Sequence, residues 1–154
     1  MDMTQSGISG LLNKDNTLLV TEPVSKEDLI SKLAALACKG LPETEGKEIL
    51  QKVLAREAGI STTLDTGLSI PHARVDEITD FKAAMAVLPR EIQDPAGDIG
   101  IKVMFLFLSP ANPKFFQKHL QVLAELSETF KESFMAKITA AAGVEEILAI
   151  INNK

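Results

Sequence analysis

The sequence predicts a single α/β domain, with helices packed on a central β-sheet. The chain has 154 residues, which is the usual size of one domain, and it contains no internal repeat or low-complexity segment. Residues 101–108 are apolar at nearly every position, which is typical of a strand buried on both faces of an α/β sheet. Segments with the apolar period of amphipathic helices lie before and after this strand. We therefore expect one layered domain over residues 1–154.

The first forty residues are expected to contain a frayed end, a short strand and a helix. Residues 1–10 are small and polar and are expected to fray, with 1–7 flexible, whereas 17–20 can form a short strand. Ser25 stands where a helix N-cap is favoured, because a carboxylate follows three residues later and an apolar series begins. This helix is expected to end near Gly40, a residue type that is favoured after helix C-termini.

A second amphipathic helix and a polar loop are expected next. The helix follows Pro42, has one apolar face and runs to about Glu57, and Gly59 stops it. Residues 61–72 are rich in Thr, Ser and Gly, so we expect a loop that enters a short strand at 68–70.

The remaining elements are two strands and three helices. Residues 83–88 form an apolar run of strand length that Pro89 is expected to close, and 90–100 are expected to form a loop. The strand at 101–108 is broken by the proline-containing segment 109–113. Apolar periodicity then predicts three helices, over 114–130, 132–141 and 144–151.

Composition and charge argue against several classes of partner. The net charge is −5, and there are seven Phe but no Trp or Tyr, so nucleic acid is not an expected partner. The single cysteine, Cys38, is expected to be a small buried residue, and no disulfide can form within the chain. The N-terminal residues do not resemble a signal peptide, and the apolar run 103–108 is too short to span a membrane. We expect a cytoplasmic protein without direct membrane insertion.

His72 is the first candidate for a functional residue. It follows Pro71, whose fixed φ and missing N–H are expected to stop the strand there and to aim the next side chain rigidly. Ligands of α/β proteins gather at the ends of strands. Arg74 lies two residues further on and can pair with an oxyanion in bidentate fashion, although a solvated charge is the simpler interpretation.

His119 is the other histidine of the chain. It lies within the apolar stripe of the predicted helix 114–130, so its ring is expected to face the body of the protein. A polar ring there is either a hydrogen-bonded core residue or a group that faces the same pocket as His72. No metal is expected, because a catalytic zinc usually takes three protein ligands and the sequence has neither an H-x-E nor an HExxH motif.

Two spaced motifs connect these histidines to other residues. The first combines the pairs Arg56-Glu57 and Ser61-Thr62 with the segment 67–74, GLSIPHAR. The second is the segment 119–126, HLQVLAEL, which follows an apolar strand. Together they resemble enzyme IIA of the bacterial phosphotransferase system, in the fructose/mannitol type that includes the nitrogen-regulatory paralogues. The resemblance extends from about residue 8 to residue 151.

The resemblance implies a mixed β-sheet flanked by helices and a protein-histidine phosphotransferase that needs no cofactor. It makes His72 the phosphorylated residue, His119 a second active-site histidine, and Arg56 a group that neutralises phosphoryl charge. The donor would be the phosphocarrier protein HPr, and the acceptor in sugar uptake would be a cysteine on an enzyme IIB. Cys38 is not that acceptor, because no phosphate-binding loop follows it.

The chemistry of such a carrier asks for a neutral imidazole and for donors to phosphoryl oxygens. An imidazole with a pKa near 6.5 can attack phosphorus without a separate base, and transfer then depends on positioning and charge stabilisation. The hydroxyls of Ser61, Thr62 and Thr63, with Arg74, are expected to support the phosphoryl group. The family often has glycine where Thr63 and Asp65 stand, so the path of this loop is expected to differ.

Three functions remain open at this point. The first is a phosphoryl carrier that takes phosphate from HPr and passes it to an enzyme IIB. The second is a nitrogen-regulatory protein that binds target proteins according to its phosphorylation state. The third is a binding module of the same fold without transfer chemistry, which is favoured if His72 is buried away from solvent.

Overall fold

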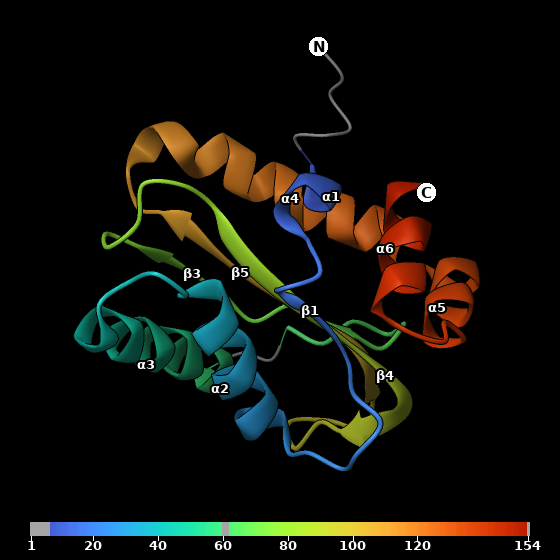
Figure 1. The fold of residues 1–154 in the computed structure, drawn as a ribbon. Coiled ribbons are helices and arrows are strands. Elements are labelled where there is room, and N and C mark those ends of the chain that lie inside the picture. The colour runs from blue at the N-terminus through green and yellow to red at the C-terminus, as the bar shows by residue number, and fades with distance from the viewer. Residues whose placement is uncertain (1–6, 60–61, 154) are drawn as a thin grey trace.

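The structure is a computed structural model that describes residues 7–59 and 62–153. A five-stranded mixed sheet lies at its centre (Figure 1), with the order β1-β4-β5-β2 and with β3 also paired to β5. β1 pairs parallel to β4, β4 pairs antiparallel to β5, and β2 and β3 both pair parallel to β5. The strand bounds are β1 (Thr17–Leu19), β2 (Leu68–Ser69), β3 (His72–Val75), β4 (Lys82–Gln93) and β5 (Gly100–Pro110).

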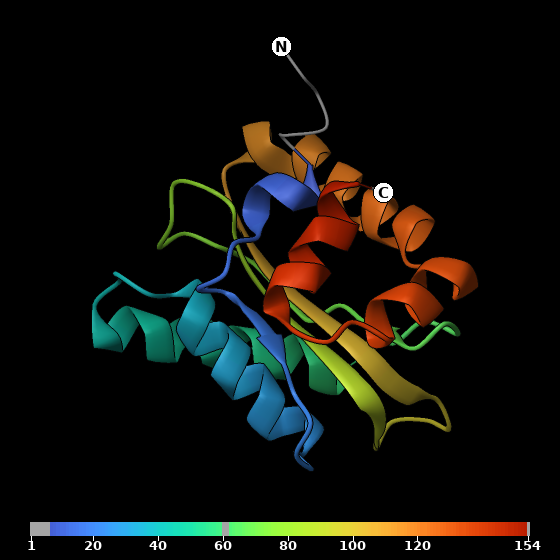
Figure 2. The same ribbon diagram turned by 45° about the vertical axis from the view of Figure 1, so that its right-hand side comes forward.

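Helices cover both faces of the sheet, as the two views in Figures 1 and 2 show. One face carries α2 (Lys26–Ala37) and α3 (Glu43–Gly59). The other carries α1 (Ile8–Leu11), α4 (Phe116–Thr129), α5 (Glu132–Thr139) and α6 (Val144–Asn152), with the 3₁₀ turn η2 (Pro113–Phe115) before α4. None of the helices in the described ranges is long and apolar enough to cross a membrane.

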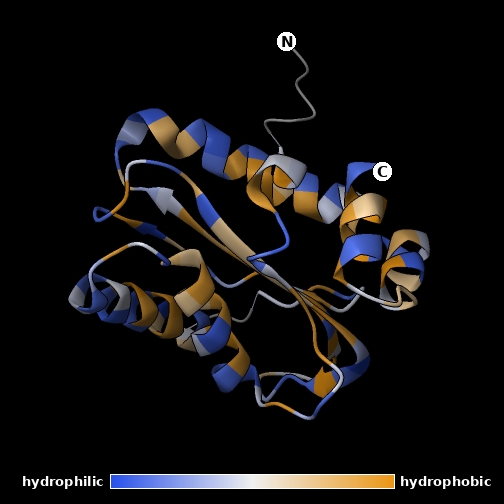
Figure 3. Cartoon of the chain, viewed as in Figure 1, coloured by the Kyte–Doolittle hydropathy of each residue, from blue (hydrophilic) through white to orange (hydrophobic). Residues whose placement is uncertain are grey.

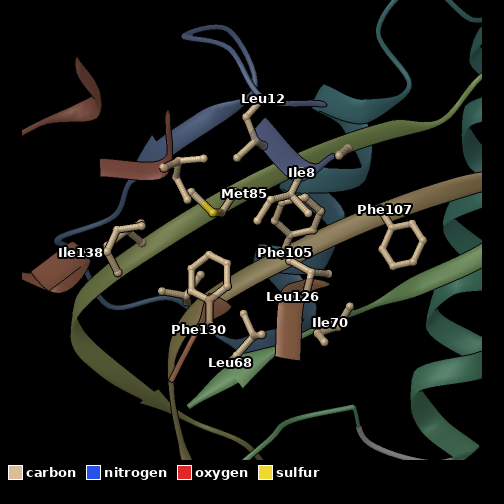
Figure 4. Close-up of a cluster of buried hydrophobic side chains, with 14 of the residues drawn as sticks. Ile8, Leu12, Leu68, Ile70, Met85, Phe105, Phe107, Leu126, Phe130 and Ile138 are labelled. Carbon is tan, nitrogen blue, oxygen red and sulfur yellow. The ribbon is translucent and has the colours of Figure 1, made fainter. Parts of the chain in front are cut away.

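The two central strands supply both hydrophobic cores. Side chains alternate along β5, so Phe105 and Phe107 pack under α4, whereas Met104 and Leu106 pack under α2 and α3. Figure 3 shows this strand pair as largely apolar, and Figure 4 shows the cluster around Phe105, with Phe107 at one end. A fully buried Phe contributes roughly 1.5–3 kcal/mol over an exposed one. The continuous apolar run of β5 is thus explained by burial on both faces.

Local signals in the sequence set the helix ends as expected. The Ser25 hydroxyl accepts a hydrogen bond from the Asp28 amide at 3.1 Å and caps α2. Gly40 follows this helix with φ of +95°, a conformation that L side chains rarely adopt. The predicted helices over 26–39 and 43–57 are therefore confirmed to within a few residues.

Two local expectations were wrong. Ile8 is fully buried within α1, so the chain is not frayed as far as residue 10, and residues 1–6 lie outside the described ranges. β4 continues past Pro89 to Gln93, because the pairing with β5 is irregular between Val87 and Ile92 and no ladder hydrogen bond is required of the proline.

The strand expected at 68–70 does stop before Pro71, as predicted, but a second short strand follows it directly on the same edge of the sheet. The edge strand breaks only between β2 and β3 and then resumes at His72, which lies opposite Phe107 of β5. The Pro71 carbonyl accepts from the Phe107 amide at 3.1 Å, so the proline interrupts the ladder without releasing the edge from β5. His72 is therefore held by strand pairing as well as by the proline before it.

Candidate functional site

The imidazole of His72 is hydrogen-bonded at both ring nitrogens. Nδ1 lies 2.6 Å from the Ile70 carbonyl oxygen, and Arg56 Nε lies 3.2 Å from Nε2. A carbonyl can only accept and a guanidinium can only donate, so Nδ1 carries the proton and Nε2 presents its lone pair. These contacts define one neutral tautomer, in which Nε2 carries the lone pair.

Burial lowers the pKa of His72 below its usual 6.5, and the charge of Arg56 lowers it further. The hydrogen bond to Ile70 acts in the other direction but does not outweigh burial. The ring is therefore neutral near pH 7, which is the form that can attack an electrophile.

The Phe107 ring packs against both histidine rings. Its ring stacks on His72 with centroids 5.3 Å apart and an interplanar angle of 10°, and its centroid lies 5.2 Å from that of His119. The strand pairing places Phe107 directly opposite His72. Sequence reasoning assigned this phenylalanine only to a buried strand, because nothing local indicates which residue it faces.

His119 lies beside His72, as one of the two alternatives for it predicted. The ring centroids are 5.5 Å apart, and both residues are 5% exposed. His119 Nδ1 lies 2.6 Å from Ser109 Oγ, so the ring is also a hydrogen-bonded core residue. Burial, together with the nearby His72, Arg74 and Arg56, lowers the pKa of His119 to about 4.

Ser109 was missed in the sequence. It lies on β5 two residues after Phe107, so the alternation of strand side chains places both on the same face. Its side chain is fully buried. The sequence signal for Ser109 was the alternation of side chains along the strand. This alternation indicates that Ser109 lies in the site only when it is known that Phe107 faces the histidines.

Arg74 lies close to the site but binds the chain rather than His72. Its Nη2 donates to the carbonyls of Ala111 and Asn112, each at 3.1 Å. Its guanidinium carbon lies 4.9 Å from the centroid of the Phe116 ring. Arg74 thus anchors the segment that connects β5 to α4, and α4 is the helix that carries His119.

The threonine hydroxyls donate to carboxylates. Thr62 Oγ1 donates to Glu57 Oε1 at 2.8 Å, and Thr63 Oγ1 donates to Asp94 Oδ2 at 2.5 Å. Lys26 Nζ joins the two acids, at 2.9 Å from Glu57 and 3.0 Å from Asp94. These hydroxyls therefore fix the loop before His72, whereas Ser61, expected beside them, lies outside the described ranges.

The two loop positions that lack the family's glycines are accommodated without strain. Asp65 is exposed and lines a cleft with Lys102 and Glu132, next to α5. No described residue other than glycine has a positive φ, and Gly67 provides the turn with φ of +95°. Across the described ranges, no group of three or more His, Cys, Asp or Glu side chains is arranged to hold a metal ion.

An apolar surface lies next to the histidines. Phe116 and Leu120 on α4 are 46% and 48% exposed, although both are large and apolar. They flank His119 in the sequence, and the Phe116 ring is stacked at 6.3 Å from the His119 ring. These two side chains, four residues apart on α4, place apolar surface on the solvent side of this helix next to His119.

Residues 10–154 match the family model of the phosphoenolpyruvate-dependent sugar phosphotransferase system, EIIA 2. A relative from Haloferax volcanii, named PTS system fructose-specific EIIA component, is 30% identical over 154 residues and 97% of each chain is covered. The nitrogen regulatory protein of Pseudomonas aeruginosa is 26% identical over 117 residues, which are 76% of this chain and 75% of that protein.

Solved structures share the fold. Nitrogen regulatory protein IIA-Ntr from Neisseria meningitidis has a TM-score of 0.79 at 25% identity, covering 94% of this chain and 98% of that chain. The complex of enzyme IIAMTL and phosphorylated enzyme IIBMTL from Escherichia coli has a TM-score of 0.74 at 21% identity, covering 93% and 98%. The mixed sheet flanked by helices, expected from the resemblance, is confirmed.

Proposed function

The chain belongs to the EIIA 2 family of the phosphoenolpyruvate-dependent sugar phosphotransferase system, and we propose that it carries a phosphoryl group on His72 Nε2. The observation that supports this most directly is the tautomer of His72, whose Nε2 is unprotonated and lies 3.2 Å from Arg56 Nε. A nucleophile and a cation for the phosphoryl oxygens therefore stand together, as phosphoryl transfer requires.

The transfer step balances without a separate base. The lone pair of His72 Nε2 forms the new N–P bond, while the N–P bond of the donor phosphohistidine breaks and its electron pair stays on the donor ring. The donor ring leaves as neutral imidazole with its remaining N–H, and no proton leaves His72. The phosphorylated ring is positively charged, and the Ile70 carbonyl stabilises it through Nδ1–H.

The low exposure of His72 is consistent with a carrier, although burial was the condition that favoured a module without chemistry. Arg56, which covers Nε2, is itself exposed on α3 and can move from the nitrogen to the phosphoryl oxygens. His72 then needs only a narrow opening, because a phosphoryl group approaches one ring edge.

The donor is the phosphocarrier protein HPr, and the acceptor is a cysteine of an enzyme IIB. The related IIAMTL is found in a complex with phosphorylated IIBMTL. The exposed Phe116 and Leu120 provide an apolar surface beside the histidines on which such partners can dock. The buried free thiol of Cys38 suits a reducing compartment, so we place this exchange in the cytoplasm.

Regulation is the second candidate function. Relatives named nitrogen regulatory protein match this chain alongside the fructose-specific relative. In that case the same phosphoryl group on His72 would control which target proteins are bound. A pull-down with wild type and His72→Ala, with and without phosphorylation, separates the two functions: state-dependent partners other than transporters indicate regulation, and a sole IIB partner indicates sugar uptake.

The site assignment is tested by labelling. The purified chain is incubated with phosphoenolpyruvate, enzyme I and HPr, and the phosphorylated residue is located by mass spectrometry and NMR. Wild type should be labelled on His72 Nε2, His72→Ala should not be labelled, and His119→Ala should be labelled more slowly. Labelling of His72→Ala at the wild-type rate would rule out the proposed site, provided that circular dichroism shows both variants folded.

A further inference from the structure

The buried pair Ser109 and His119 carries a consequence for the proton on the second histidine. Ser109 Oγ lies 2.6 Å from His119 Nδ1, and Ser109 is fully buried. Within residues 7–59 and 62–153, this is the one side-chain hydrogen bond that Ser109 makes. His119 Nε2, on the other side of the ring, makes no hydrogen bond with the described residues.

The direction of this hydrogen bond follows from where the protons can go. A hydroxyl has one proton to donate, and a neutral imidazole has one donor nitrogen and one acceptor nitrogen. If Nδ1–H donated to Ser109, the hydroxyl proton would be buried without an acceptor among the described residues. If the hydroxyl donates to Nδ1, the hydroxyl proton is bonded, and the ring proton is on Nε2, the nitrogen that a ligand can reach.

We propose that Ser109 is a positioning residue that keeps the proton of His119 on Nε2, from where it is donated to a phosphoryl oxygen on His72. The ring centroids of the two histidines are 5.5 Å apart, so a group bound to His72 Nε2 comes within reach of the second ring. Phe107 packs against both rings and limits their rotation. The low pKa of His119 agrees with a neutral ring that has a single donor nitrogen.

The two imidazoles therefore hold opposite tautomers for opposite tasks. His72 is protonated on Nδ1 by its contact with a backbone carbonyl, so its Nε2 is a nucleophile. His119 is protonated on Nε2 by its contact with a hydroxyl, so its Nε2 is a donor. A carbonyl in the place of the Ser109 hydroxyl would reverse the second assignment, because it can only accept. This inference extends the proposed function and rests on it only for the phosphoryl group.

The tautomer is measured directly in the unphosphorylated protein. Nitrogen-15 NMR of the histidine rings, at a pH where both are neutral, distinguishes a bare Nδ1 from a protonated one. Wild type should show His119 with the proton on Nε2 and His72 with the proton on Nδ1. A proton on His119 Nδ1 in wild type would overturn the proposal, whether or not His72 is ever phosphorylated.

Variants separate positioning from simple filling of the core. Ser109→Ala should let His119 exchange between tautomers, which averages its two nitrogen shifts, and should slow phosphorylation of His72 roughly 10- to 100-fold. Ser109→Thr keeps the hydroxyl and should restore both readouts. Ser127→Ala removes an exposed hydroxyl from the same helix α4, bonded to the Leu123 carbonyl, and should change neither. A Ser109→Ala protein that keeps the wild-type tautomer and rate would show that Ser109 only fills space.

Discussion

Arg56 Nε lies 3.2 Å from His72 Nε2 and joins the last turn of α3 to the start of β3. The contact has two effects on the same nitrogen. It presents a cation at the point where phosphoryl charge would develop, and it lowers the pKa of His72 in addition to the effect of burial. The nitrogen with the lone pair and its charge partner thus come from two different elements, the edge strand β3 and the helix α3.

Replacement of Arg56 should slow phosphoryl acceptance more than it alters folding. Arg56→Gln removes the cation, and we expect the rate of His72 labelling by phospho-HPr to fall roughly 100-fold. Arg56→Lys keeps the positive charge and should recover part of the rate. The recovery should be incomplete, because an ammonium group lacks the planar set of donors of a guanidinium. Lys52→Gln removes a positive charge one turn earlier on α3, where Lys52 pairs with Glu77 at 3.2 Å, and serves as the matched control. Equal rates for Arg56→Gln and Lys52→Gln would remove Arg56 from the site.

Acidification should destabilise the protein through His119. Its pKa is about 4 in the folded state and 6.5 when unfolded, so between these values the unfolded state binds more protons and stability falls as pH falls. This pKa shift corresponds to a contribution of about 3 kcal/mol to the free energy of unfolding at neutral pH, and the contribution is fully lost once the pH is below 4. Urea unfolding from pH 7 to pH 4.5 should show a shallower decline for His119→Gln than for wild type. Parallel curves for the two proteins would contradict the low pKa.

Loss of Lys26 should destabilise the fold and loosen the loop before His72. Burial acts to lower the pKa of Lys26, but its hydrogen bonds with Glu57 and Asp94 outweigh burial and raise the pKa above 10.5. Lys26→Met leaves two buried carboxylates without their shared cation, and the free energy of unfolding should fall by about 3–5 kcal/mol. Lys47→Met is the control, because it breaks an ion pair with Glu43 in which the two side chains are 75% and 85% exposed. This variant should change the free energy of unfolding by less than about 1 kcal/mol.

The exposed apolar surface should affect docking and not chemistry. Leu120→Gln should leave the fold unchanged and raise the KM for phospho-HPr roughly tenfold, because a truncated interface anchor typically weakens binding by more than about 1 kcal/mol. The kcat at saturating donor should stay close to wild type. Glu128→Gln, an exposed change two turns further along α4, is the comparison. An unchanged KM for Leu120→Gln would place the docking surface elsewhere.

Local chemistry explains which features could be predicted. The cap at Ser25, the glycine after α2 and the apolar run of β5 each depend on a few neighbouring residues, and each is found in the structure. The end of β4 was misplaced because the effect of Pro89 depends on the partner strand, whose pairing is irregular at that point. His72 and His119 as phosphoryl-handling residues stay predictions until the labelling is done.

The sequence by itself determined the fold class, the family and the two histidines, because periodicity and motif spacing are local or ordered along the chain. Only the tertiary structure decided which hydrogen-bond partner each polar side chain has. The Lys26–Asp94 pair spans 68 positions, and Arg74 binds carbonyls 37 and 38 positions away. Such partners are brought together by strand pairing and helix packing. The same packing brings the Ser109 hydroxyl into hydrogen-bond contact with His119 Nδ1. The proton positions of the site are therefore a property of the folded chain.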